Sequence, residues 1–488
     1  MDEEAVSSNL AWLVGVTLVG YVGFMYALSF AIQRRIHEAA DFIVAGRRLP
    51  FSLAWATLLA TWFGAGTMLT AADEVRDGGL RRAALDPWGA GFCLLLAGLF
   101  FARPLWEMGL LTLSDFYRRK FGAAAELGSV VIMVPSYFGW VAAQLVALAG
   151  LLHFYFGLDL VTGILLVAAV AMGYTLLGGM WSVTITDAAQ ISLVLVGLVV
   201  LTLTVLAELG QGHWGAGLAR LEAETPGDML QLVPTESLRD VVGWLGVFAV
   251  GALGNLPGQD LMQRVFAARS ARTAQLACLT AGGVYLLFGT LPLLLGLSAR
   301  LLVPDDLKRS ILPALAGAFL SPPLAVIFTL ALASAVLSTI DSAILSPASV
   351  LSQNLLAKFN RGRISPLTLN RLAVVLVTAA SVGMALAGQD AYTLLEDAYE
   401  LPLVGLLVPL VIGLYAGPQR EGPAVVAMLV GSGLWMVHFV AGWDEFGQPW
   451  TAGSRLHLPV ALTAAAVSLV AYGLAAWLWP RSTAGPIS

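Results

Sequence analysis

The chain has 488 residues, of which 58% are hydrophobic and only 12% are charged, whereas soluble domains carry roughly 25% charged residues. This composition excludes a soluble enzyme, and no acid–base or nucleophile constellation is visible in the sequence. The net charge of −5 and the short, scattered basic clusters do not support nucleic-acid binding. We therefore expect residues 1–488 to form a single polytopic membrane domain.

The apolar residues fall into runs long enough to cross a bilayer, for which a helix needs about 20 residues. In chain order the runs are 10–32, 50–72, 84–105, 124–153, 159–177, 183–207, 240–265, 273–299, 322–353, 367–387, 401–416, 422–441 and 457–479. They predict an all-α integral membrane protein with about 13 transmembrane helices. The first run lacks a basic leader, so we expect it to be a retained span and not a signal peptide.

The distribution of arginine and lysine predicts the orientation, because basic loops stay on the cytoplasmic side. Most basic residues, including Arg47, Arg119 and Arg264, fall on one side if the N-terminus is outside and the C-terminus is cytoplasmic. The acidic loop at about 207–239 then lies outside. We expect this multi-pass topology in the plasma (inner) membrane.

Two of the runs contain residues that interrupt a helix. The second run holds Gly64 and Gly66, and the seventh holds Pro257 between two glycines. A broken helix inside a bilayer is tolerated where it is buried in protein or lines a watery cavity. The two runs are five apart, which predicts two inverted five-helix repeats. The alternative is close helix packing at the glycines and a simple proline kink.

These runs divide the chain into an extra N-terminal helix at 10–32, a first repeat at 50–207, an inverted second repeat at 240–416 and two extra C-terminal helices at 422–479.

Polar residues inside the runs indicate a cation site. At helical spacing, the ninth run places one stripe of small and hydroxyl residues beside Asp341: Ala335, Ser338, Thr339, Ser342, Ser346 and Ser349. Hydroxyl and carboxylate oxygens suit a small hard cation, although small-residue helix packing would produce the same stripe. Asp187 in the sixth run is either a cation or proton ligand or a capping carboxylate near the interface.

Four further acidic residues lie near the ends of predicted runs: Asp86, Asp260, Glu396 and Asp397. We expect them to be solvated or salt-bridged more often than to contact a substrate.

Several motifs in order resemble the sodium/solute symporter family. They lie at 41–50, 60–66, 98–104, 109–116, 174–187 and 338–342. The resemblance implies a LeuT-type core of five plus five helices in inverted repeats, with one helix before it and two after. Among the branches of the family, the motifs at 60–66 and 98–102 look closest to the choline transporters.

The resemblance also implies the binding residues. The main sodium site would be formed by the carbonyls of Ala60, Phe63 and Ala335 and the hydroxyls of Ser338 and Thr339. A second cation site would involve Asp187, Asp341 and Ser342, where Asp341 stands in place of a hydroxyl residue. Whether that site takes sodium, a proton or a substrate cation stays open.

The implied solute site is lined by residues of the two broken helices and the fourth run: Trp62, Gly64, Thr67, Trp140, Gly258 and Gln259. Trp62 and Trp140 match two aromatic residues of a cage that would hold an ammonium by cation–π contact. Gly258 and Ala90 stand where the cage of the choline branch has further aromatic residues. The solute is therefore an amine, an amino acid or a carboxylate.

Together these features predict a sodium-coupled secondary active symporter that imports a small organic solute by alternating access. Its partners would be sodium ions, the solute and the lipid bilayer. The alternatives are a proton-coupled transporter of the same fold and a solute sensor that does not transport.

Overall fold

We describe the fold from a computed structural model that covers residues 8–304, 310–388, 391–416, 419–443, 445–448 and 458–478. Residues 1–7 and 479–488 lie outside this description, as do most residues between the final two helices; the two end residues 457 and 479 of the last predicted run are among them. Within it the regular structure is helical, apart from one isolated bridge between Leu49 and Ala268.

The helices follow one another closely along the chain. They are α1 Ser8–Ile32, α2 Ala39–Val44, α3 Phe51–Trp62, α4 Ala71–Gly78, α5 Ala90–Leu96, α6 Ala102–Glu107, α7 Leu113–Lys120, α8 Ala123–Phe156, α9 Leu160–Leu209, α10 Trp214–Glu224, α11 Leu238–Gly254, α12 Gln259–Ala267, α13 Ala271–Leu302, α14 Ile311–Phe319, α15 Pro322–Val350, α16 Ala357–Asn360, α17 Pro366–Ala385, α18 Ala391–Tyr415, α19 Glu421–Ala441 and α21 Val460–Leu478.

Eleven helices of the described chain are long and apolar enough to cross a membrane, or twelve when the bent pair Phe51–Trp62 and Gly66–Gly78 counts as one span. The predicted number of thirteen is not confirmed. The difference lies at α9, where the sequence predicts two spans at 159–177 and 183–207 and the structure has a kinked helical segment of 50 residues. At 1.5 Å per residue α9 is about 75 Å long, far more than a bilayer core of about 30 Å, and Gly179 interrupts it with φ 48° and ψ −153°.

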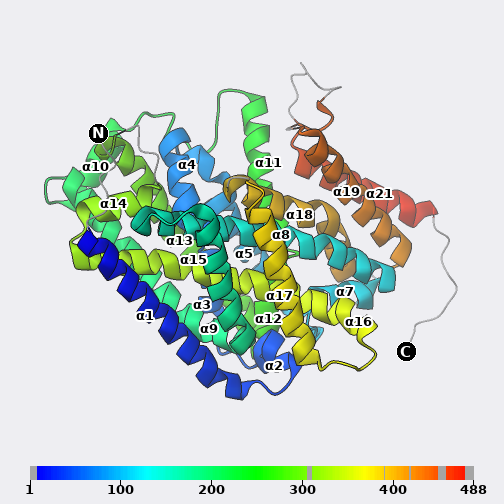
Figure 1. Cartoon of the computed structure of the whole chain (residues 1–488). Helices are drawn as coiled ribbons and strands as arrows, with labels where there is room; N and C mark the ends of the chain where they lie inside the picture. The colour runs from blue at the N-terminus through cyan, green and yellow to red at the C-terminus, as the bar shows by residue number, and fades with distance from the viewer. Residues whose placement is uncertain are drawn as a thin grey trace.

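The first and the last helices lie at opposite edges of the molecule. Figure 1 shows α1 along one edge and α19 with α21 along the other. Both edges expose large apolar side chains, among them Val19 on α1 and Val440 on α19, as expected for surfaces that face lipid. The helices between them enclose the buried core.

Two spans of this core are broken, as the sequence predicts. The α3 helix ends at Trp62, Phe63 takes non-helical dihedrals, and the chain resumes as a π-helix at Gly66–Thr70 followed by α4, bent by 59°. The second break separates α11 from α12 at residues 255–258, where Pro257 supplies no backbone N–H. The α15 helix, buried over most of its length, is in contact with α3, α8, α9 and α12.

Candidate functional site

The break after α3 is held by polar side chains of two other helices. The Ser338 hydroxyl on α15 donates to the Ala60 carbonyl at 3.0 Å, and the side-chain oxygen of Gln144 on α8 accepts from the Ala65 N–H at 2.8 Å. A Cβ at Gly64 would lie 2.5 Å from the Thr339 hydroxyl oxygen. The unwound backbone is therefore in direct contact with the hydroxyl stripe of α15.

The other residues predicted for the main sodium site lie at the same level. The Thr339 hydroxyl donates to the Ala335 carbonyl at 3.2 Å, one turn back on α15. Phe63 is fully buried at the break, and its ring packs edge-on against Tyr285 with 5.2 Å between the ring centres. These contacts bring Ala60 and Gly64 of the break to Ser338 and Thr339, with Phe63 as their neighbour along the chain.

Asp187 and Asp341 lie beside this region and are fully buried. Asp187 on α9 accepts a hydrogen bond from the Thr57 hydroxyl at 2.5 Å, and Ser338 lies close to it. Asp341 accepts from the Tyr174 hydroxyl at 2.7 Å. Each carboxylate has a second oxygen, Oδ1 of Asp187 and Oδ2 of Asp341, with no hydrogen-bond partner in the described structure. Buried polar atoms are rarely left in this state.

Arg264 lies in the core, whereas the sequence predicts it in a cytoplasmic loop. It lies inside α12 and is only 1% exposed. Its guanidinium donates to the Ser342 hydroxyl, to the Thr57 carbonyl at 3.4 Å and to the Asp260 carbonyl at 3.0 Å. Arg264 is therefore the buried cation of this polar region, and Ser342 contacts it directly.

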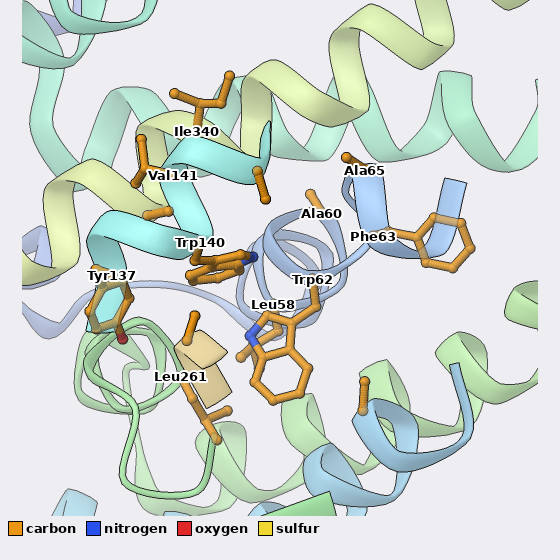
Figure 2. Packing of buried hydrophobic residues seen from close by; sticks show 14 of the residues in the cluster. Leu58, Ala60, Trp62, Phe63, Ala65, Tyr137, Trp140, Val141, Leu261 and Ile340 are labelled. Atoms are coloured by element: carbon orange, nitrogen blue, oxygen red, sulfur yellow. The ribbon is translucent and has the colours of Figure 1, made fainter. Parts of the chain in front are cut away.

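An aromatic group surrounds the start of α12. The Trp62 indole N–H donates to Asp260 Oδ2 at 2.7 Å, and the Tyr137 hydroxyl donates to Asp260 Oδ1 at 2.5 Å. Figure 2 shows Trp62 at the end of α3 and Tyr137 and Trp140 on the neighbouring helix α8. The Trp140 ring centre is 5.7 Å from that of Tyr137 and 6.4 Å from that of Tyr399 on α18. Asp260 is thus buried at the centre of this group, which corrects the expectation of a solvated residue near a span end.

Asp86 lies near the backbone of Trp62. It was also expected to be solvated or salt-bridged near a span end, and it too is buried. It is 9% exposed. The Thr67 hydroxyl lies 2.9 and 3.0 Å from its two oxygens, and the Tyr285 hydroxyl donates to Oδ1 at 2.8 Å. The Tyr285 hydroxyl is also 3.0 Å from the Trp62 carbonyl oxygen. Of the residues predicted for the solute site, Thr67 therefore contacts Asp86 directly, and Trp62 reaches it through the Tyr285 hydroxyl.

Two predicted solute-site residues have other neighbours. Gln259 uses its amide oxygen to accept from the Leu113 N–H on α7 at 2.7 Å, while its amide nitrogen has no hydrogen-bond partner among the described residues. Gly258 has no room for a side chain, because a Cβ there would lie 2.8 Å from the Asn255 carbonyl and 2.9 Å from Asp260 Oδ1. Gly64 faces Thr339, so it belongs with the hydroxyl stripe and not with the aromatic group.

Several residues of the site were not predicted from the sequence: Thr57, Tyr137, Gln144, Tyr174, Tyr285 and Tyr399. All but Tyr399, which precedes the run at 401–416, lie in apolar runs whose helical period gives no sign of their partners. A buried glutamine or tyrosine in a membrane span is a signal, since its polar atoms need hydrogen bonds, but that signal does not identify the partner.

Comparisons with known proteins agree on the family. The profile described as "Sodium:solute symporter family" matches residues 42–431. The human high affinity choline transporter 1 is 27% identical over 447 residues, covering 87% of this chain and 76% of the relative. The sodium/glucose cotransporter of Vibrio parahaemolyticus is 24% identical over 421 residues, covering 80% and 77%. Both names describe transporters, in agreement with the prediction that this chain is not an enzyme.

The fold is also found among solved structures. A sodium-coupled sialic acid symporter in an outward-open state superposes with a TM-score of 0.77 at 18% identity, covering 96% of this chain and 98% of that one. This similarity confirms the predicted LeuT-type all-α membrane fold. Together with the profile match over most of the chain, it leads to one conclusion: the chain belongs to the sodium:solute symporter family and is a sodium-coupled solute symporter.

Proposed function

We propose that this symporter imports a small organic amine by alternating access across the plasma (inner) membrane, with its N-terminus outside. Two observations support the amine. Trp62 and Trp140 belong to a buried aromatic group, and the choline transporters are among the relatives that cover most of this chain. Aromatic faces attract an organic cation with about 0.5–2 kcal/mol per contact. An amino acid or a carboxylate is the competing solute and is an outcome of the test below.

The sodium ion that drives import would bind between the break of α3 and α15. The ligands are the carbonyls of Ala60, Phe63 and Ala335 and the hydroxyls of Ser338 and Thr339. The observation that carries this assignment is the 3.0 Å contact between the Ser338 hydroxyl and the Ala60 carbonyl, which joins the two helices at the break. A cation here would replace the hydroxyl protons as the partner of the carbonyls that unwinding has freed.

A second cation would bind between Asp187 and Asp341, next to Ser342. Their unpaired oxygens support this site, because a buried carboxylate oxygen without a donor is stabilised by a cation or by a proton. Ser338 lies within reach of Asp187 and also contacts Ala60, so it would connect the two cation sites. The ion and the solute would then favour the same conformation, which is the requirement for coupling.

The two-repeat organisation completes the proposal. The repeats at 50–207 and 240–416 would rock against each other around the two broken helices, while 10–32 and 422–479 flank them. Solute bound beside Trp62 and sodium bound beside Ser338 would share the broken α3 segment. Movement of that segment would expose both to the same side of the membrane.

The test is uptake by purified protein in proteoliposomes, with and without an inward sodium gradient, for an amine, proline and a short carboxylate. The Ser338→Ala, Thr339→Ala double variant should lose sodium-dependent uptake. Alanine has no hydroxyl, so the variant lacks two of the five proposed oxygen ligands. The matched control is Thr378→Ala with Ser381→Ala, which removes two buried hydroxyls of α17 that bond only to their own helix. Unchanged sodium activation in the double variant would contradict the assignment of the main sodium site. Uptake of the carboxylate alone would contradict an amine as the solute.

A further inference from the structure

The surroundings of Asp86 contain more hydrogen-bond acceptors than donors. The Thr67 and Tyr285 hydroxyls supply one hydrogen each, and they are shared between the two Asp86 oxygens, the Trp62 carbonyl and each other. A carboxylate alone offers about four lone-pair positions. At least two acceptor positions on Asp86 therefore remain for another donor, in a place that is 9% exposed.

Asp86 also differs from Asp260 in its electrostatic surroundings. Asp260 has Arg264 one turn further along α12, bonded to its carbonyl at 3.0 Å and within electrostatic reach of its carboxylate. Around Asp86 the described residues provide hydroxyl partners and no basic side chain. A buried carboxylate without a cation is costly in a membrane and is usually retained for function. Such a carboxylate is stabilised either by a proton or by a cation, and a cation would have to come from outside the described surroundings of Asp86.

The position of Asp86 connects it to the proposed solute site. Tyr399 lies within electrostatic reach of both Asp86 and Asp260, and its ring packs edge-on against Trp140. Asp86 is bridged to the Trp62 carbonyl through the Tyr285 hydroxyl. Asp86 therefore adjoins the backbone of Trp62 through Tyr285, and Tyr399 connects it to the aromatic group that contains Trp140.

We propose that the transported amine carries N–H groups, and that Asp86 binds its ammonium directly while Trp62 and Trp140 contact its apolar part. This inference rests on the proposed amine symport. A primary ammonium offers three hydrogens to the acceptors of Asp86 and the Trp62 carbonyl, and charge-assisted hydrogen bonds of this kind are about twice as strong as neutral ones. A quaternary ammonium has no N–H and would leave those acceptors unpaired.

The balance of buried charge agrees with a solute of a single positive charge. With all groups ionised, the region of the two breaks holds four carboxylates, Asp86, Asp187, Asp260 and Asp341, and one guanidinium, that of Arg264. Three negative charges are then uncompensated. A sodium ion at the main site, a cation between Asp187 and Asp341 and one monovalent ammonium at Asp86 would balance them. A carboxylate solute would add to the excess.

The experiment compares four ligands with one skeleton: choline, N,N-dimethylethanolamine, N-methylethanolamine and ethanolamine. Binding to the purified full chain in lipid nanodiscs at saturating sodium is measured by calorimetry. We expect affinity to rise as methyl groups are replaced by hydrogen, with ethanolamine at least tenfold tighter than choline. Asp86→Asn should weaken ethanolamine about ten- to hundredfold, from about 1.5–3 kcal/mol for a charged hydrogen bond, and bring the ethanolamine-to-choline ratio toward one.

The control is Asp73→Asn, which removes a carboxylate of α4 that accepts from Ser310 and Ile311 instead and should keep the parent ratio. Tighter binding of choline than of ethanolamine by the parent, or an unchanged ratio in Asp86→Asn, would overturn the inference and leave amine symport standing. If none of the four amines binds the parent or is taken up with sodium, amine symport itself fails. If Asp86→Asn does not fold, the order of the four ligands on the parent decides.

Discussion

A single methyl group added at Gly64 should weaken sodium binding. The Cβ of Gly64→Ala would lie 2.5 Å from the Thr339 hydroxyl oxygen, 2.8 Å from the Gln144 side-chain oxygen and 3.0 Å from the Thr339 Cβ. Real Cβ atoms do not approach so closely, so the Thr339 and Gln144 side chains or the break itself must shift. Overpacking of this kind costs about 1–3 kcal/mol.

The size of the effect on sodium follows from where that strain is relieved. If the strain is relieved only when the Ala60 carbonyl leaves Ser338, the same free energy is lost from ion binding. At 1.4 kcal/mol per tenfold, the sodium concentration for half-maximal uptake should rise roughly 5- to 150-fold. Maximal uptake at very high sodium should fall less, because the methyl does not enter the aromatic group around Trp62.

The assay is solute uptake into proteoliposomes over a wide range of sodium concentration. A potassium salt free of choline keeps the ionic strength constant. The matched control is Gly283→Ala on α13, where a Cβ would meet nothing within 4 Å. Parent-like sodium dependence in Gly64→Ala would refute the argument that the break and Thr339 enclose the ion. A similar loss in Gly283→Ala would show that any added methyl disturbs the protein.

Two further predictions address the other sites. If Asp187 binds a second sodium ion, Asp187→Asn should lower the Hill slope or the apparent affinity for sodium. If Asp187 carries a proton, the variant should abolish the pH dependence of uptake. Neither change would mean that Asp187 has only a structural role. Trp140→Leu should weaken an amine by up to about thirtyfold, since a cation–π contact contributes about 0.5–2 kcal/mol, and Trp62→Leu should weaken it further because the hydrogen bond to Asp260 is also lost. If amine affinity is unchanged in both leucine variants, the rings serve only packing.

The sequence by itself determined the class of the protein, the approximate positions of most apolar helices and the two broken helices. These are local properties. A run of about 20 apolar residues is visible in any window, and glycine or proline interrupts a helix through its own backbone chemistry. The hydroxyl stripe of α15 was predictable for the same reason, because residues three and four apart share a helix face.

The tertiary structure decided which polar groups meet. Asp86 and Asp260 look like span-end residues along the chain, yet the fold buries both on either side of Trp62. Arg264 looks like a loop residue, yet it enters the core and contacts Ser342. The physical reason is that the partners of these groups come from helices up to 207 residues apart in sequence. The charge that a buried carboxylate needs depends on those partners and not on its neighbours along the chain.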